Sequence, residues 1–195
     1  MKNLIIIINL FSIQFLFSQE NYLFNYRITY QSDSTNSFKK SEDFHLIRNE
    51  NGFSFFASSN LLKKDSLINQ IGNTELSIID MAKFPKTNFK YYIIKDSKDS
   101  IISFYDNVIK HKFIYEENPD FNWFITNEKQ NIGKLSCRKA TTAKFGRNWT
   151  ACFSEEIPIS DGPYKFSGLP GLILKISDEK NHYTFELIEI KKNKY

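Results

Sequence analysis

The sequence predicts a mainly β protein, a single domain of antiparallel strands forming a curved, bowl-like or half-barrel sheet, with at most one short helix. Residues 22–30 alternate aromatic and β-branched side chains with mostly polar ones, the period-two pattern typical of a strand. About ten strand-length runs follow one another with short polar or glycine-containing connections. No internal repeat, low-complexity segment or linker interrupts the series, so residues 19–195 are expected to form one β-rich domain.

The individual elements follow from local patterns. Asn51-Gly52 between two alternating runs predicts a β-hairpin, and the polar stretch 95–100 predicts a second one. Residues 61–71 are the best helix candidate, with Asn60 as a possible N-cap. Strand-length runs occur at 22–30, 44–48, 53–57, 89–94, 101–105, 110–115, 123–126, 135–142, 148–153, 172–177 and 183–191.

The N-terminus reads as an export signal over residues 1–18. Lys2 supplies a positive start, Leu4–Phe17 an apolar stretch, and Ser18 a small residue for cleavage. The apolar stretch is interrupted by polar residues and is shorter than the roughly 20 residues of a spanning helix. We therefore expect an exported protein, periplasmic or associated with the outer membrane or secreted, without a transmembrane segment in the mature chain. No cysteine directly follows the apolar stretch, so a lipid anchor is not expected.

Composition and motifs argue against several functional classes. The 195-residue chain has 26 Lys and Arg against 22 Asp and Glu, and the interspersed charges predict a solvated surface with no nucleic-acid partner. His45, His111 and His182 show no ligand-like spacing, so no metal site is expected. The sequence has no glycine-rich phosphate loop either, and no cofactor is expected.

Cys137 and Cys152 are the only cysteines, and they lie on the two arms of a predicted hairpin. If its loop spans residues 143–146, Thr142 faces Arg147 and the cysteines fall directly opposite each other, within reach of a bond. We expect a disulfide, since disulfides persist in exported proteins. Two buried thiols are the alternative. A catalytic thiol is not expected, because no motif supplies a base.

The stretch 157–176 is expected to be the architectural centre of the chain. Its first part contains three of the five prolines together with Gly162, Gly168 and Gly171, and such density favours one rigid path. If Gly168 or Gly171 holds a positive φ, glycine avoids the strain that a side chain would add there. Residues 172–176 are an apolar run of strand length that should enter the core.

This stretch also carries a family resemblance. Gly168-Leu169-Pro170-Gly171-Leu172-Ile173 spells the hexapeptide that names the GLPGLI family, and the chain resembles that family from about Trp123 to Ile190. Cys152 departs from the pattern, which has an aromatic residue there. The other matching residues are Trp123, Asn131-Ile132-Gly133, Cys137-Arg138-Lys139-Ala140-Thr141, Gly146-Arg147, Glu156-Ile157-Pro158, Gly162-Pro163, Phe166, Asp178, Tyr183 and Phe185.

The resemblance implies an exported Bacteroidetes protein without an established reaction. Domains similar to this family are also joined to secreted glycan-processing enzymes, which implies an accessory role in recognising glycans or glycopeptides. The family tends to run further than Tyr195. We therefore expect either a truncated member or a last strand that rests on the sheet edge.

The candidate ligand-binding residues are aromatic, with one arginine: Tyr164, Trp149, Trp123 and Arg147. Exposed on a concave sheet, such rings could stack against a sugar, a peptide or a lipid chain; buried, they are core. Tyr164 is the best exposed candidate because it follows Pro163 in a loop, and Phe166 should point the other way.

We expect a non-enzymatic binding or accessory module of the periplasm or outer-membrane surface, with an unknown envelope ligand or partner. A hydrolase that uses the loop carboxylates Glu155, Glu156 or Asp161 with Arg147 is the first alternative. Simple solvation of these carboxylates is the plainer interpretation, and a purely structural envelope protein is the second alternative. A deep pocket with inward carboxylates would favour the enzyme, whereas an open, aromatic-lined bowl would favour the binding module.

Overall fold

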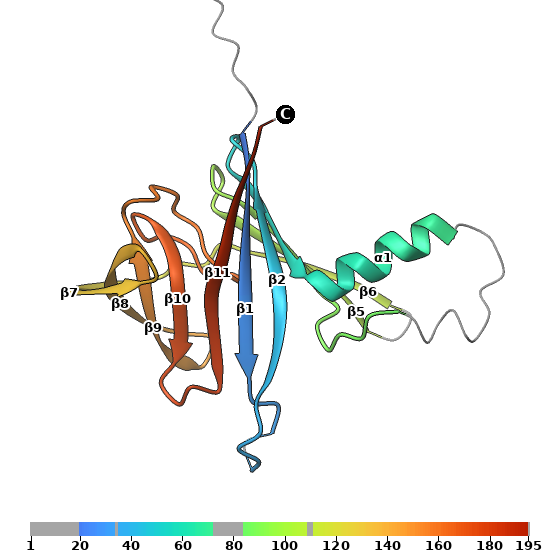
Figure 1. Cartoon of the computed structure of the whole chain (residues 1–195), viewed down its shortest axis with the longest axis horizontal. Coiled ribbons are helices and arrows are strands. Elements are labelled where there is room, and N and C mark those ends of the chain that lie inside the picture. The colour runs from blue at the N-terminus through green and yellow to red at the C-terminus, as the bar shows by residue number, and fades with distance from the viewer. Residues whose placement is uncertain (1–19, 34, 72–83, 109–110, 195) are drawn as a thin grey trace, which may run out of the picture.

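A computed structural model of the chain describes residues 20–33, 35–71, 84–108 and 111–194, so the predicted export signal lies outside the described residues. The described chain forms eleven strands and one helix, which confirms the predicted mainly β class (Figure 1). The elements are β1 (Glu20–Tyr30), β2 (Lys40–Arg48), β3 (Phe53–Ser58), α1 (Ser59–Ile71), β4 (Tyr92–Asp96), β5 (Ile101–Val108), β6 (His111–Glu117), β7 (Phe124–Ile132), β8 (Leu135–Lys144), β9 (Arg147–Ser154), β10 (Leu172–Asp178) and β11 (Tyr183–Lys194).

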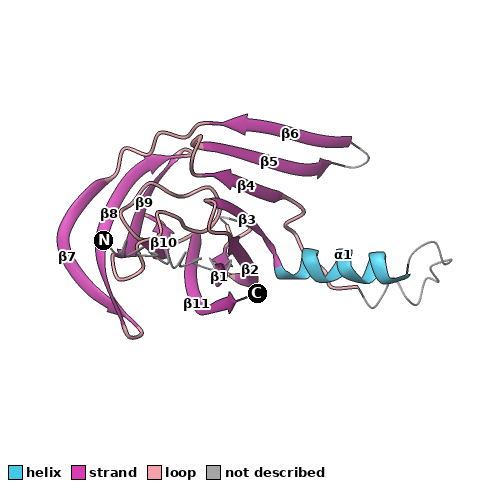
Figure 2. Cartoon of the chain, turned by 90° about the horizontal axis from the view of Figure 1, so that it is seen from above, coloured by secondary structure: helices cyan, strands magenta, loops and turns pink. Residues whose placement is uncertain are grey.

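All eleven strands belong to one antiparallel sheet in the order β6-β5-β4-β3-β2-β1-β11-β10-β9-β8-β7. The sheet is strongly curved but not closed, and the connection from β6 to β7 runs between its two edge strands (Figure 2). The last strand, β11, pairs with β1 and β10 in the middle of the sheet. The expectation that it rests on a sheet edge is therefore wrong, because the first strand already provides its partner.

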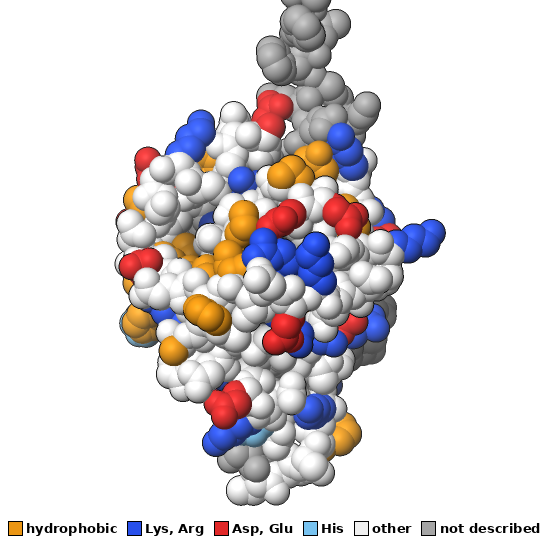
Figure 3. Space-filling model, turned by 90° about the vertical axis from the view of Figure 1, so that its left-hand side faces the viewer, with side chains coloured by type: hydrophobic (Ala, Val, Ile, Leu, Met, Phe, Trp, Pro, Cys, Tyr) orange, Lys and Arg blue, Asp and Glu red, His pale blue; other side chains and the backbone are white. Residues whose placement is uncertain are grey.

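The two edge strands, β6 and β7, lie on different sides of the molecule (Figure 2). Figure 3 views the side that carries β7, where charged side chains of both signs are scattered and hydrophobic ones gather left of centre. Phe124 at the start of β7 is 71% exposed. On β6 the exposed large side chains are Phe113, Ile114 and Tyr115.

Strand β1 shows why the sheet has a filled concave face. The alternate residues Phe24, Tyr26, Ile28 and Tyr30 are buried, as the period-two pattern predicts. The hydroxyl of Tyr26 donates a 2.7 Å hydrogen bond to the backbone oxygen of Ile173 at the start of β10. The first strand and the end of the glycine-rich loop are thereby fixed to each other.

The β9–β10 connection, residues 155–171, fills the inside of the curve (Figure 2). Its backbone is held by bonds from Leu172 N to Ile157 O and from Ile173 N to Asp161 O, each 3.0 Å. Phe166 and Leu169 are buried against the sheet. The chain therefore adopts a single defined path in this loop, as its proline and glycine content predicted.

Helix α1 confirms the predicted helix, but Asn60 is not its cap. The hydroxyl of Ser58 accepts hydrogen bonds from the backbone N–H groups of Asn60 and Leu61, so Ser58 is the N-cap. The Asn60 side chain instead donates to the backbone oxygen of Lys86. The cap lies earlier because β3 leads into the helix without an intervening loop.

The β8–β9 hairpin joins the two cysteines, but in another register than expected. Cys137 and Cys152 form a disulfide with a Cα–Cα distance of 5.5 Å. Lys144 pairs with Arg147, and Lys139 rather than Cys137 lies opposite Cys152, so the cysteines are diagonal neighbours. The turn is only Phe145-Gly146, both with positive φ (54° and 71°), which suits a two-residue hairpin loop.

Replacing Cys152 with serine is expected to lower the midpoint of thermal unfolding. Closing a loop of this length is worth about 3 kcal/mol in the chain-entropy model. Thermal unfolding followed by circular dichroism, with and without reductant, measures the effect. Two reactive thiols in the unreduced, denatured protein would contradict the bond.

Candidate functional site

A small cavity lies on the inner face of the sheet where β9, β11 and the end of β1 meet the β9–β10 connection, residues 155–171, which we call the central loop. Its volume is about 280 Å³, near the lower end of the range for ligand pockets. We call it the aromatic pocket, because seven of its nine lining residues carry aromatic rings. They are Ile28, Phe89, Tyr91, Phe145, Arg147, Trp149, Tyr164, Tyr183 and Phe185.

The pocket wall formed by the sheet consists of residues that strand periodicity places on one face. Arg147 and Trp149 are alternate residues of β9, and Tyr183 and Phe185 are alternate residues of β11, so each pair shares a face. The β8–β9 turn adds Phe145, whose ring packs edge-on against the Tyr164 ring at 5.8 Å.

The central loop supplies the opposite wall. Tyr164 holds a positive φ of 53° and is half-buried, with its ring edge-on to Tyr91 at 6.0 Å and near-parallel to Phe185 at 6.4 Å. A non-glycine residue with positive φ is uncommon and is sustained only by its surroundings. The packing around this ring therefore holds it at the pocket wall.

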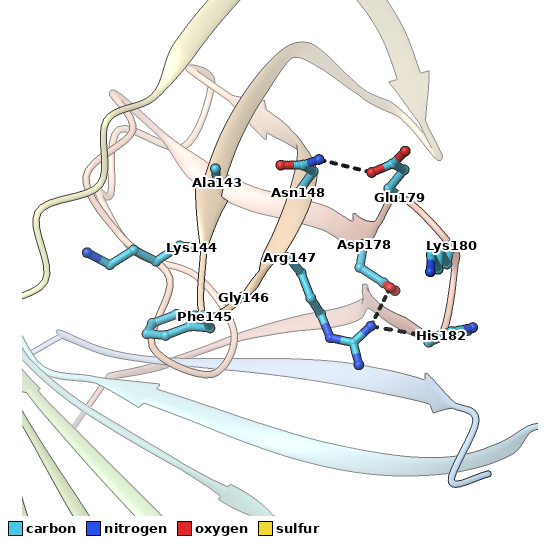
Figure 4. Close-up of a pocket in the computed structure, with 10 residues that line it drawn as sticks. All are labelled: Ala143, Lys144, Phe145, Gly146, Arg147, Asn148, Asp178, Glu179, Lys180 and His182. Carbon is cyan, nitrogen blue, oxygen red and sulfur yellow. Dashed lines mark hydrogen bonds and ion pairs between the residues drawn. The ribbon is translucent and has the colours of Figure 1, made fainter. Parts of the chain in front are cut away.

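Among the described residues that line the pocket, Arg147 alone is charged. Its Nη1 donates to Asp178 Oδ2 at 2.8 Å and lies 3.4 Å from His182 Nδ1, as Figure 4 shows. The guanidinium also lies over the Tyr183 ring, 4.9 Å from its centre. Asp178 is buried and accepts the backbone N–H of Tyr183 at 2.7 Å, so it fixes both the arginine and the strand beneath it.

A second, more open cavity of about 880 Å³ lies outside the aromatic pocket (Figure 4). It is formed by the β8–β9 and β10–β11 turns and shares Phe145 and Arg147 with the aromatic pocket. The Arg147 side chain is 35% exposed. Since a guanidinium has five N–H donors, Arg147 can keep Asp178 and still bind a ligand that enters from this side.

Three tyrosine hydroxyls complete the polar content of the pocket. The hydroxyls of Tyr91, Tyr164 and Tyr183 make no hydrogen bond to any described residue. Burial raises the pKa of Tyr91 well above its ordinary value and also raises the pKa of Tyr164, against the opposing charge of Lys165. Both therefore stay protonated near neutral pH and can donate to a ligand.

Lys165 stabilises the part of the central loop that carries Tyr164, through contacts with β5 and β6. Its ammonium lies 4.6 Å from the Tyr115 ring centre and 4.9 Å from that of Phe104, and it pairs with Glu117 Oε1 at 2.5 Å. Burial alone would lower the pKa of Lys165, but hydrogen bonds to Glu117 and Tyr115 outweigh it and raise the pKa. This anchored lysine fixes the loop on the β5–β6 side, directly next to Tyr164.

The structure brings three of the four predicted ligand residues together. Tyr164, Trp149 and Arg147 all line the aromatic pocket, although Trp149 is buried rather than exposed. Trp123 does not line it; its Nε1 donates to the backbone oxygen of Ser167 at 2.8 Å. Phe166 does not point away from Tyr164, because the two ring centres are only 6.1 Å apart and Phe166 is fully buried.

The three loop carboxylates are not gathered in the pocket. Asp161 is buried and ion-paired with Lys95 and with Arg48, so the expectation that it is solvated is wrong. Glu155 pairs with Arg138 on the exposed surface, and Glu156 accepts the backbone N–H of Ser136. Arg147 is paired with Asp178, not with any of the three.

Within the described ranges, no group of three or more His, Cys, Asp or Glu side chains is placed to hold a metal ion. Among the helical residues that are described, none belongs to a helix with the length and apolarity needed to cross a bilayer.

Six pocket residues were not predicted as site residues: Ile28, Phe89, Tyr91, Phe145, Tyr183 and Phe185. The alternation of Tyr183 and Phe185 gave a usable signal, since it places both rings on one strand face. Phe145 gave none, because a turn residue next to glycine is ordinarily read as solvent-exposed.

Fold and site together define an open, curved antiparallel sheet protein with an aromatic pocket on its inner face. Residues 146–175 match a family model described as "Protein of unknown function (Porph_ging)". That segment contains Arg147, Trp149 and Tyr164, so part of the pocket lies within the matched region. A comparison with curated proteins finds no match.

Solved structures with a similar fold include two of PNGF-II, in different crystal forms. They match with a TM-score of 0.60 at 13% and 14% identity, and each match covers 90% of this chain. The matched region is 28% and 29% of the PNGF-II chains, so this chain spans less than a third of their length. At this identity the likeness concerns the fold.

Proposed function

We propose that the protein is an exported, non-enzymatic binding module that holds a ligand of the cell envelope in the aromatic pocket. The observation that carries the proposal is the lining of that pocket: aromatic walls, three phenolic hydroxyls and one partly exposed arginine. Aromatic surface with a few placed polar groups is the usual composition of a ligand site.

A glycan or glycopeptide is the ligand class that this lining suits best. Sugar rings offer flat apolar faces that stack on aromatic side chains and hydroxyls that exchange hydrogen bonds with phenols and a guanidinium. The charge of Arg147 is balanced by Asp178, so a neutral ligand is not disfavoured. The membership of the GLPGLI family that the hexapeptide suggests is part of the same proposal.

Binding rather than hydrolysis is favoured by the position of the acidic groups. Glycoside hydrolysis ordinarily needs two carboxyl groups flanking the scissile bond. The loop carboxylates proposed for that role are engaged elsewhere, and Asp178 uses both oxygens on Arg147 and on the Tyr183 backbone. Export is supported by the N-terminal sequence pattern and by the disulfide.

The test is an array of glycans and glycopeptides probed with the purified protein. Tyr164→Phe, which removes one pocket hydroxyl, and Arg147→Lys, which keeps the charge, should each weaken binding by about tenfold. Phe124→Ala on the exposed edge strand β7 is the matched control and should bind as the unaltered protein does. If no array component binds, or if both pocket variants bind normally, the proposal is wrong.

A further inference from the structure

The two edges of the open sheet differ in how they are protected against pairing with another strand. Edge strand β7 is interrupted by an irregularity in its pairing with β8 between Ile125 and Lys129, and it carries Glu128 and Lys129 in that region. Bulges are one of the usual means by which proteins block an edge. Strand β6 instead pairs with β5 without interruption from Glu117 to His111.

Strand β6 exposes a short, regular apolar edge. Its sequence is HKFIYEE, without proline or glycine, and Phe113, Ile114 and Tyr115 are 52%, 61% and 46% exposed. Backbone N–H and C=O groups on such an edge are available to a further strand.

The sequence of β6 complements itself when the strand is reversed. In an antiparallel pair centred on Ile114, each Lys112 lies opposite Glu116 of the other copy, and each Phe113 lies opposite Tyr115. Opposite charges and aromatic pairs are the cross-strand neighbours that stabilise a sheet. A two-fold axis through Ile114 therefore gives every residue from 112 to 116 a favourable cross-strand neighbour.

We propose that β6 is a homodimerisation edge, at which two copies of this chain pair β6 with β6 in antiparallel fashion about Ile114. The arrangement is isologous and joins the two curved sheets into one continuous sheet. It stands independently of the ligand proposed for the aromatic pocket.

The neighbouring outer face supplies apolar area for the same contact. A groove of about 320 Å³ runs beside the edge, between β3 and β6. Tyr105 lies opposite Ile114 in the β5–β6 ladder, so both side chains are on the groove side of the sheet. Its apolar lining residues are Phe55, Tyr92, Ile94, Tyr105, Phe113 and Ile114.

Charge selects this register over the alternatives. A parallel pair in register would set Lys112 against Lys112 and Glu116 against Glu116, and like charges directly opposite are destabilising. Centring the antiparallel pair on Phe113 instead would set Lys112 opposite Ile114 and away from Glu116. The register about Ile114 is thus the one that sets Lys112 of each copy opposite Glu116 of the other.

The test measures the mass of the purified chain in solution over a dilution series, by light scattering and sedimentation. The protein should reach twice the mass of one chain. Lys112→Glu and Glu116→Lys should each weaken dimerisation by about tenfold or more, because each puts like charges opposite one another twice. The double variant Lys112→Glu/Glu116→Lys restores the pairs with reversed polarity and should dimerise like the unaltered protein.

Lys129→Glu on β7 is the matched control and should leave the mass unchanged. Circular dichroism of each variant separates loss of pairing from loss of folding, and recovery in the double variant does so independently. A chain that is monomeric at every concentration overturns the proposal, including the case in which β6 accepts a strand from another protein. A dimer unaffected by both single variants overturns it as well.

Discussion

Replacing Gly171 with alanine is expected to destabilise the protein by roughly 3 kcal/mol or more, at or beyond the upper end of overpacking effects. A Cβ at this position would lie 2.1 Å from the backbone oxygen of Ser154 and 2.6 Å from its carbonyl carbon. Both atoms belong to the end of β9, so relief would require the strand and the loop to separate. Denaturant titration of the purified variant measures the loss.

Substitutions at two other positions in the loop serve as controls for this prediction. Gly168 has a φ of +89° and no atom closer than 3.6 Å to an added Cβ, so Gly168→Ala should lose only about 1 kcal/mol through backbone strain. Ser167→Ala should have the smallest effect of the three. Equal stabilities for all three variants would contradict a rigid loop closely apposed to β9.

Replacing Asp161 with alanine is expected to destabilise the fold by about 3–5 kcal/mol, the usual loss when one partner of a buried ion pair is removed. Asp161 and Lys95 are buried, and Arg48 reaches the same carboxylate at 2.9 Å. Without the aspartate, the lysine keeps only the backbone oxygens of Gly162 and Phe166, at 2.6 and 3.4 Å.

The matched control is Asp43→Ala, which removes an exposed ion pair. The side chain of Asp43 is 42% exposed and that of its partner Arg27 is 51% exposed. That variant should lose no more than about 1 kcal/mol, as exposed pairs do. Similar losses for Asp43→Ala and Asp161→Ala would show that the buried cluster does not anchor the loop.

Acid should weaken the same cluster. Burial alone would raise the pKa of Asp161, but Lys95, Ser54 and Arg48 together lower it below the ordinary value of 3.8. Since the folded pKa lies below the unfolded one, the carboxylate stabilises the fold fully above about pH 4, and this contribution is lost as the pH falls through the folded pKa. Acid titrations of stability should therefore be shallower for Asp161→Asn than for the unaltered protein.

Local patterns were sufficient to predict most of the fold. The alternation in β1, the turn residues of the hairpins and the single helix each follow from sequence neighbours, and the structure has all of them. The predicted register of the β8–β9 hairpin differs from the observed register by two residues. Its two-residue turn needs positive φ at Phe145, which sequence does not favour.

The site was predictable only where it lies close to the glycine-rich loop. Tyr164, Trp149 and Arg147 are near one another in sequence, and proximity to the loop was enough to select them. Tyr91 comes from a distant segment, and its place in the pocket depends on the curvature of the whole sheet. The burial of Asp161 likewise depends on partners from β2 and β4, which no local pattern indicates.

Tryptophan fluorescence tests ligand binding in the aromatic pocket most directly. The chain has two tryptophans, and only Trp149 lines the pocket, so Trp123→Phe leaves one reporter at the site. Titration with the strongest binder from the glycan and glycopeptide array should give a saturable change in Trp149 emission, which Arg147→Lys shifts to higher ligand concentration. Binding that leaves Trp149 emission unchanged in the Trp123→Phe variant, while Trp123 emission changes in the Trp149→Phe variant, would place the ligand elsewhere and contradict the account.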